Sequence, residues 1–156
     1  MNINKDYNKI LNDKKDMPKI IKLDDKLINK WGKETMVVAP PTDYDDLIKK
    51  IPYGKLVITE NIRNEIAKKY QVDMTCPFTC GIFINIVAYS SYQRNENLTP
   101  FWRVLKSNGE LNSKFPEGIE LQKRLLIEEG HTIITKGKNN IKYYVLDYQK
   151  KLYDFN

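Results

Sequence analysis

The sequence predicts an α+β fold that is mainly α and has small β elements. Two observations support this fold class. Apolar residues recur near the helical period in four segments, and residues that start or stop helices bound each of them. The candidate strands are short and lie beside these helices. We expect residues 1–40 to form a partly flexible N-terminal arm and residues 41–156 to form the main domain. The four helical segments are residues 42–51, 60–70, 77–91 and 119–129.

The arm is expected to contain short elements only. Residues 1–16 are rich in Lys and Asn, which predicts a loosely ordered segment or a marginal helix. Residues 18–23 are expected to be extended. Asp24 can cap a short helix that ends at Gly32, because a glycine readily adopts the left-handed conformation at a helix end. Residues 36–39 predict a short strand, which the two following prolines stop.

The first two helices of the main domain have recognisable starts. Thr42 and Asp45 resemble a capping box, and the Pro-Tyr-Gly sequence at 52–54 ends this helix. Thr59 is expected to cap the helix over 60–70. The buried face of the first helix is predicted to be Tyr44, Leu47, Ile48 and Ile51, and that of the second Ile62, Ile66 and Tyr70.

The helix over 77–91 is the most apolar segment of the chain. Thr75 can cap it, and a proline suits its first turn. Gly81 permits either close approach of a phosphate or close packing of another helix. No Lys or Arg lies between Lys69 and Arg94. The predicted core face is Phe78, Ile82, Phe83, Ile86 and Val87. The face left for a ligand is Thr75, Thr79, Gly81, Asn85 and Ser90.

The last third of the chain begins with a buried apolar turn at 100–105 and a polar loop. Gly130 is placed to end the helix that follows this loop. Residues 131–135 and 141–145 predict a β-hairpin around a Gly-Lys-Asn-Asn turn. Residues 146–155 are expected to close the chain as a short helix.

Composition limits the classes of function. With 41% hydrophobic and 29% charged residues, 156 residues can bury one ordinary core. The mean hydropathy of −0.57 and the absence of a long apolar run exclude a membrane span, and the polar N-terminal sequence predicts a cytoplasmic protein. A net charge of +6 gives weak support to a polyanionic partner, since most lysines of a basic protein are ordinary surface residues.

The residues that hold metals or act as nucleophiles are few. Cys76 and Cys80 lack a second cysteine pair or a nearby histidine, so we expect core residues rather than a zinc site or a disulfide. His131 is the only histidine, and we expect it to be structural. We therefore expect neither a metal nor a cofactor.

The segment 99–130 contains an ordered set of residues whose spacing resembles the active-site half of the O6-alkylguanine-DNA alkyltransferase family. The signature of that family is Pro-Cys-His-Arg-Val, a Ser/Asp-Asp/Asn-Gly loop, and Gly-Leu-Glu followed by Leu-Leu and Glu-Gly. Residues 51–62 are similar to the start of the family's helix-turn-helix. The matching positions are Pro100, Arg103, Val104, Ser107, Asn108, Gly109, Leu111, Gly118, Ile119, Glu120, Leu125, Leu126, Glu129 and Gly130.

The resemblance implies a winged-helix-like, helix-turn-helix domain that binds double-stranded DNA, with or without alkylated bases, in DNA repair or lesion sensing. Two positions depart from the signature, because the nucleophilic cysteine aligns with Phe101 and its histidine partner with Trp102. Alkyl transfer needs a thiolate, so the chain is not expected to be an enzyme. Glu129 matches the third member of the relay and is expected to have nothing to orient. The resemblance thus points to the non-catalytic alkyltransferase-like subgroup.

The two aromatic residues allow two interpretations. Phe101 and Trp102 either fill a former active site as core residues or line a retained base-reading pocket. In the family, the recognition helix starts with an arginine and the helix before it carries a base-flipping tyrosine. Here the recognition helix lacks a basic residue, and the tyrosine aligns with Thr59. The positions implied to bind DNA are Arg103, Lys106, Ser107, Asn108 and Lys114, together with Thr59, Asn61, Arg63, Thr79, Gly81 and Asn85.

Two other functions remain open. The first is a protein-interaction or structural module that reuses the fold without binding DNA, most simply through the arm around Trp31. The uncharged recognition helix favours this alternative, since helices that dock in a groove normally bring donors to phosphates. The second is an active alkyltransferase that uses Cys76 or Cys80. It is disfavoured because neither cysteine lies in the Pro-Cys-His-Arg context.

Overall fold

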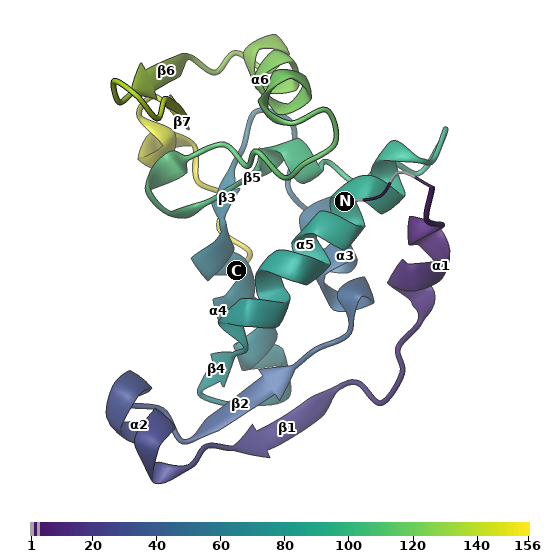
Figure 1. Cartoon of the computed structure of the whole chain (residues 1–156), viewed down its shortest axis with the longest axis vertical. Coiled ribbons are helices and arrows are strands. Elements are labelled where there is room, and N and C mark those ends of the chain that lie inside the picture. Colours follow the sequence, from purple (N-terminus) through teal and green to yellow (C-terminus); the bar gives the residue numbers. More distant parts are fainter. Residues whose placement is uncertain (1, 3) are drawn as a thin grey trace.

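The computed structural model describes residue 2 and residues 4–156. The fold is mixed α/β with 45% helix and 16% strand in small sheets, which confirms that helices prevail. In Figure 1, α5 crosses the centre, the β1–β2 ribbon lies at the bottom of the molecule and the β6–β7 hairpin lies at the top. The helices are α1 (Tyr7–Asn12), α2 (Asp25–Trp31), α3 (Pro41–Lys49), α4 (Thr59–Tyr70), α5 (Pro77–Tyr92) and α6 (Ile119–Glu128). The strands are β1 (Lys19–Lys22), β2 (Thr35–Val38), β3 (Val57–Ile58), β4 (Met74–Thr75), β5 (Val104–Leu105), β6 (Ile133–Lys136) and β7 (Lys142–Val145).

The N-terminal elements contact the rest of the chain at two places. β1 pairs with β2 in antiparallel orientation, and β2 pairs in parallel with β4, which lies between α4 and α5. α1 packs against α5, where the Tyr7 ring lies 5.0 Å from that of Tyr89 and its backbone N–H donates to Gln93 Oε1 at 2.9 Å. The marginal helix and the extended segment are confirmed, as is the α2 cap, where Asp24 accepts from the Leu27 N–H at 2.9 Å. A domain boundary at residue 40 stays a prediction.

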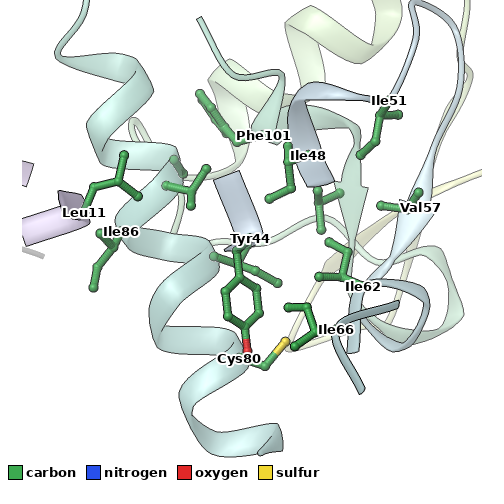
Figure 2. Close-up of a cluster of buried hydrophobic side chains, with 14 of the residues drawn as sticks. Leu11, Tyr44, Ile48, Ile51, Val57, Ile62, Ile66, Cys80, Ile86 and Phe101 are labelled. Atoms are coloured by element: carbon green, nitrogen blue, oxygen red, sulfur yellow. The ribbon is translucent and has the colours of Figure 1, made fainter. Parts of the chain in front are cut away.

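The main core lies between α3, α4 and α5. Figure 2 shows Tyr44 and Ile48 from α3 facing Ile66 from α4, with the Tyr44 hydroxyl next to the sulfur of Cys80 from α5. All four side chains are buried. Amphipathic helices at these spacings bury one apolar stripe each, so three helices enclose a continuous core.

Three predicted N-caps are wrong. α3 begins at Pro41, one residue before Thr42, because a proline fits the first turn, where its missing N–H has no partner to lose. α4 includes Thr59, and the Asn61 side chain accepts from the Ile58 N–H at 3.1 Å instead. Thr75 does not cap α5, since its hydroxyl donates to the Arg63 carbonyl at 2.8 Å.

The predicted faces of α5 are partly wrong. Phe78 and Ile82, expected in the core, are 70% and 56% exposed, whereas Thr75 and Ser90, expected to face a ligand, are buried. α5 is apolar all round, so its period does not distinguish the inner face from the outer one. Its buried residues are Cys80, Ile84, Ile86, Val87, Ala88, Tyr89, Ser90 and Ser91.

The C-terminal hairpin is confirmed, with β6 and β7 paired from Ile133↔Val145 to Lys136↔Lys142. The predicted closing helix is correct for one short segment only, a 3-10 helix over Tyr148–Lys151. Beyond it, Leu152 forms a parallel bridge with Leu56, just before β3. In this bridge the Leu56 N–H donates to the Lys151 carbonyl, and the Leu56 carbonyl accepts from the Tyr153 N–H.

In the part of the chain that the structure describes, no helix is long and apolar enough to cross a membrane. The cytoplasmic location stays a prediction.

Candidate nucleic-acid interface

A groove runs between the N-terminal half of α5 and the loop that follows β5. Its volume is about 460 Å³, and we call it the α5 groove. One wall is the outer face of α5, the other is formed by residues 106–114, and α4 contributes the end. Eight of the eleven positions that the sequence implied to bind DNA line it: Thr59, Arg63, Gly81, Asn85, Lys106, Ser107, Asn108 and Lys114.

The remaining three positions lie elsewhere. The Arg103 guanidinium is turned inward, where its Nη1 donates to the Ile51 carbonyl at 2.7 Å and its Nε pairs with Glu129. Asn61 caps α4 and borders a different hollow beside the C-terminal residues. Thr79 donates to the Cys76 carbonyl at 3.4 Å and does not line the groove. These three side chains are engaged inside the fold, so we omit them from the candidate interface.

The loop wall is held by a buried glutamine that sequence reasoning missed. Gln122 on α6 accepts from the Asn112 N–H at 2.8 Å and donates to the carbonyls of Val104 and Trp102 at 3.0 and 3.2 Å. Asn112 in turn donates to Asn85 Oδ1 at 3.3 Å, which joins the loop to α5. The signal was the one uncharged polar residue of α6, which lies next to the apolar stripe of this helix. Gln122 thus ties the loop wall to α6 and to the backbone at β5, through hydrogen bonds that satisfy its buried side-chain atoms.

The charges of the groove are mixed, with an excess of cations on its lining. Arg63 Nη2 lies 3.7 Å from Glu60, and Lys106 Nζ lies 3.7 Å from Glu110. Lys114 has no carboxylate within 4.0 Å among the described residues. Burial alone would raise the pKa of Glu60, but a hydrogen bond from Ser107 and the nearby Arg63 lower it. Glu60 therefore stays ionised at neutral pH, and a phosphate in the groove would compete with it for Arg63.

Phe101, which the resemblance aligns with the family's nucleophile, lies in the core. Phe101 is 3% exposed and makes edge-to-face contacts with Trp102 and Phe115, at centroid distances of 5.4 and 5.3 Å. Phe101 does not line the groove. The burial of Phe101 favours the interpretation that the two aromatic residues are core residues, rather than the lining of a retained base-reading pocket.

Glu129 has more to orient than we expected. Its side chain is 4% exposed and accepts from the Gly54 N–H at 2.7 Å, the Arg103 Nε at 2.9 Å and the Trp102 Nε1. Burial would raise the pKa of Glu129, but these hydrogen bonds and the guanidinium outweigh it and lower the pKa. The carboxylate thus joins η1 (Phe101–Arg103), the end of α6 and the turn before β3. The expectation that Glu129 has nothing to orient was wrong, because the Trp102 indole N–H and the Arg103 guanidinium both donate hydrogen bonds to its carboxylate.

The cysteines are core residues, as predicted. Cys76 and Cys80 are both free and buried. Burial raises the pKa of the Cys80 thiol to about 11, so almost no thiolate exists at neutral pH. Among the residues that the structure describes, no group of three or more His, Cys, Asp or Glu side chains could hold a metal ion.

His131 is buried just before β6 in the chain, and its Nε2 has no hydrogen-bond partner among the described residues. Burial lowers the pKa of His131; Glu129 opposes this effect, while Lys151 and Arg103 reinforce it. The folded protein therefore holds the neutral imidazole. Because the unfolded chain binds a proton more readily, folding stability is expected to be lost as pH falls below the ordinary histidine pKa of about 6.5.

This prediction can be checked by urea unfolding between pH 7 and pH 5.5. The free energy of unfolding should fall over this window for the native chain, and the decline should be much weaker for His131→Phe. His131 is the only histidine, so no other side chain titrates ordinarily in this range. An equal decline in both proteins would contradict the assignment.

Comparisons with known proteins agree with the geometry at the level of the fold. No protein-family model matches the sequence, and no curated protein matches it as a relative. Solved structures do match, and the two described next have an alkyltransferase-like fold.

The first is S. pombe Atl1 in complex with damaged DNA containing O6-carboxymethylguanine. It matches with a TM-score of 0.51 and 23% identity, over 73% of this chain and 94% of the other. The second, S. pombe ATL in complex with DNA, matches with a TM-score of 0.52 at the same identity and coverage. The resemblance to alkyltransferase-like proteins is thereby confirmed for the fold.

Proposed function

We propose that this chain is a non-enzymatic protein that binds double-stranded DNA in the α5 groove and serves DNA repair or lesion sensing. In this proposal α4 and α5 act as a helix-turn-helix pair, and the β6–β7 hairpin is the wing of a winged-helix-like domain. The matched S. pombe structures contain DNA, and one of these DNAs is damaged. That observation belongs to those proteins and motivates the proposal for this one.

The observation that carries the proposal is the convergence of eight implied positions on one groove. Arg63 comes from α4, Gly81 and Asn85 from α5, and Lys106 and Lys114 from the loop after β5. These elements are far apart in sequence, and residues chosen at random would scatter over the surface. Cationic and hydrogen-bonding side chains around a concave surface are typical of contacts to a phosphate backbone.

The absence of catalysis is inferred from chemistry. The sequence resemblance aligns Phe101 with the family's nucleophile, and a phenyl ring cannot accept an alkyl group in this reaction. The thiol of Cys80 is buried and protonated, so it offers no replacement. Binding without transfer is the function that these residues support.

Lesion recognition can be tested by fluorescence anisotropy with a short labelled duplex, with and without one O6-methylguanine, at low salt. We expect both duplexes to bind and the damaged one to bind about tenfold more tightly, which corresponds to about 1.4 kcal/mol. Equal affinity would leave a general DNA-binding protein without lesion sensing. No binding to either duplex would contradict the proposal and favour the protein-interaction alternative.

A further inference from the structure

β1 forms an outer edge of the three-stranded sheet, and β2 lies between it and β4 (Figure 1). The strand has the sequence Lys-Ile-Ile-Lys, and all four of its residues are exposed. Ile20 is 59% exposed and Ile21 is 39% exposed, and neither belongs to the buried apolar clusters of the described residues. Two β-branched side chains left in water forgo the free energy of their burial. Their placement on β1 therefore needs a reason other than the stability of the isolated chain.

The backbone hydrogen bonds show which groups of β1 point outward. β1 and β2 are antiparallel, and in the same register just past β1 the Leu23 N–H donates to the Glu34 carbonyl at 2.8 Å. In an antiparallel pair, positions that bond to the neighbouring strand alternate with positions that face away from it. Ile21 therefore bonds to β2 as Leu23 does. Ile20 and Lys22 direct their N–H and C=O groups to the free edge.

The other side of β2 agrees with this assignment. Val37 lies opposite Ile20, and its carbonyl accepts from the Cys76 N–H at 3.0 Å, in the direction away from β1. The Val37 carbonyl is thus not bonded to Ile20. Among the described residues, no other strand pairs with the outer edge of β1.

The charge of this part of the arm indicates which strand would pair there. Residues 14–33 contain seven lysines and three aspartates, so this segment carries a net charge of +4 out of the +6 of the chain. Lys19 and Lys22 flank the two isoleucines of β1. Lys19 Nζ lies 3.8 Å from the exposed Asp16, and Lys22 has no carboxylate within 4.0 Å among the described residues. Opposite charges on neighbouring strands stabilise their pairing, and like charges destabilise it.

Two other occupants fit this edge less well. A second copy of this chain would bring two segments of charge +4 together, and lysines on an edge strand are a common protection against such self-pairing. A nucleic acid would meet the lysines, but its phosphate backbone offers no N–H donor to the outward carbonyls. A protein strand with acidic side chains satisfies the outward backbone groups, the isoleucines and the lysines together.

We infer that β1 is a docking edge for an extended acidic segment of a protein partner, which adds a fourth strand to the sheet. The partner's backbone bonds to Ile20 and Lys22, and its apolar side chains cover Ile20 and Ile21. Its carboxylates lie opposite Lys19 and Lys22. No residue of the arm lines the α5 groove, so the docking edge is separate from the proposed DNA site and does not depend on it.

The test uses the full chain and a synthetic peptide, Ser-Thr-Glu-Val-Val-Glu-Thr-Ser. This sequence reads the same in both directions, so it matches β1 in parallel or antiparallel orientation. The peptide should slow amide hydrogen exchange at Ile20 and Lys22, whose N–H groups point outward. The Ile21 N–H, which already bonds to β2, should change little. In fluorescence anisotropy, the same peptide with lysines in place of its glutamates should bind about tenfold more weakly.

Ile20→Pro tests the backbone contact directly. Proline removes the outward N–H but no hydrogen bond to β2, and edge strands tolerate proline where the N–H faces solvent. The circular dichroism spectrum should stay native, and the acidic peptide should bind about tenfold more weakly, because its acceptor is left without a donor. Ile20→Ala is the matched control, since it shortens the side chain but keeps the N–H. It should lose less affinity than Ile20→Pro.

A charge reversal tests the choice of partner. Lys19→Glu combined with Lys22→Glu should reverse the preference, so that the lysine peptide binds more tightly than the acidic one. Lys26→Glu combined with Lys33→Glu changes the net charge equally at exposed positions of the arm outside β1. This control should still prefer the acidic peptide.

Three results would overturn the inference. Unchanged hydrogen exchange at Ile20 and Lys22, or equal binding of the two peptides, would show that no acidic strand pairs with β1. A dimer at micromolar concentration that Ile20→Pro dissociates would assign the edge to a second copy. Weaker duplex binding by Ile20→Pro, without peptide binding by the native chain, would assign it to DNA. The peptide assays contain no DNA, so a native chain that binds the peptide but no duplex would support the docking edge and contradict the proposed function alone.

Discussion

Replacing Glu129 by alanine is expected to lower the free energy of unfolding by about 3–5 kcal/mol, because it leaves a buried guanidinium without its counter-ion. Arg103 is 12% exposed and cannot recover full hydration when its partner is removed. The Gly54 N–H and the Trp102 indole N–H also lose their acceptor. Unpaired buried donors each cost about 1–3 kcal/mol. Urea unfolding monitored by circular dichroism measures this change.

Glu128→Ala is the matched control for this prediction. Glu128 is the preceding residue on α6 and is exposed, so its replacement should change stability by no more than about 0.5 kcal/mol. Glu129→Gln should fall between the two variants, since an amide oxygen still accepts a hydrogen bond but carries no charge. A loss below about 1 kcal/mol for Glu129→Ala would show that the carboxylate is not the junction that we describe.

Replacing both Lys106 and Lys114 by alanine is expected to weaken duplex binding about 30-fold at low salt, which corresponds to roughly 1 kcal/mol for each phosphate contact. Both lysines are exposed on the loop wall of the groove, so the fold should tolerate the change. The slope of log K against log salt should become shallower by about 1.8, which is about 0.9 for each contact. Fluorescence anisotropy over a series of salt concentrations gives both quantities.

The control must remove the same charge from another surface. Lys26 and Lys138 are exposed and lie outside the groove, and their double replacement lowers the net charge equally. If general attraction to a polyanion explained binding, this variant would lose as much affinity as the groove variant. We expect a much smaller loss.

The fold could be predicted from sequence where the signals were local. The Asp24 cap and the C-terminal hairpin depend on residues a few positions apart, and both are confirmed. The errors arose where a segment distant in sequence determined the structure, or where one residue type is compatible with two different roles. Pro41 starts α3, although the paired prolines were read as a stop. Leu152 leaves the helical conformation because it pairs with Leu56, almost a hundred positions earlier in the chain.

The candidate site could also be predicted where local sequence signals determine it, and not where distant residues do. The loop cations could be placed because the order and spacing of the alkyltransferase signature fix that loop. The inward turn of Arg103 could not, since nothing local reveals that Glu129 lies 2.9 Å from it. The exposure of Phe78 and Ile82 was missed because a helix that is apolar on every side has no unique inner face.

The most direct test of DNA binding in the α5 groove is the salt dependence of duplex binding by the native chain. Arg63, Lys106 and Lys114 line the groove, and contact of all three with phosphates predicts a slope of log K against log salt of about −2.7. A slope near this value that becomes shallower when the loop lysines are removed would support the account. Binding that is flat between low and moderate salt, or absent at low salt, would contradict it.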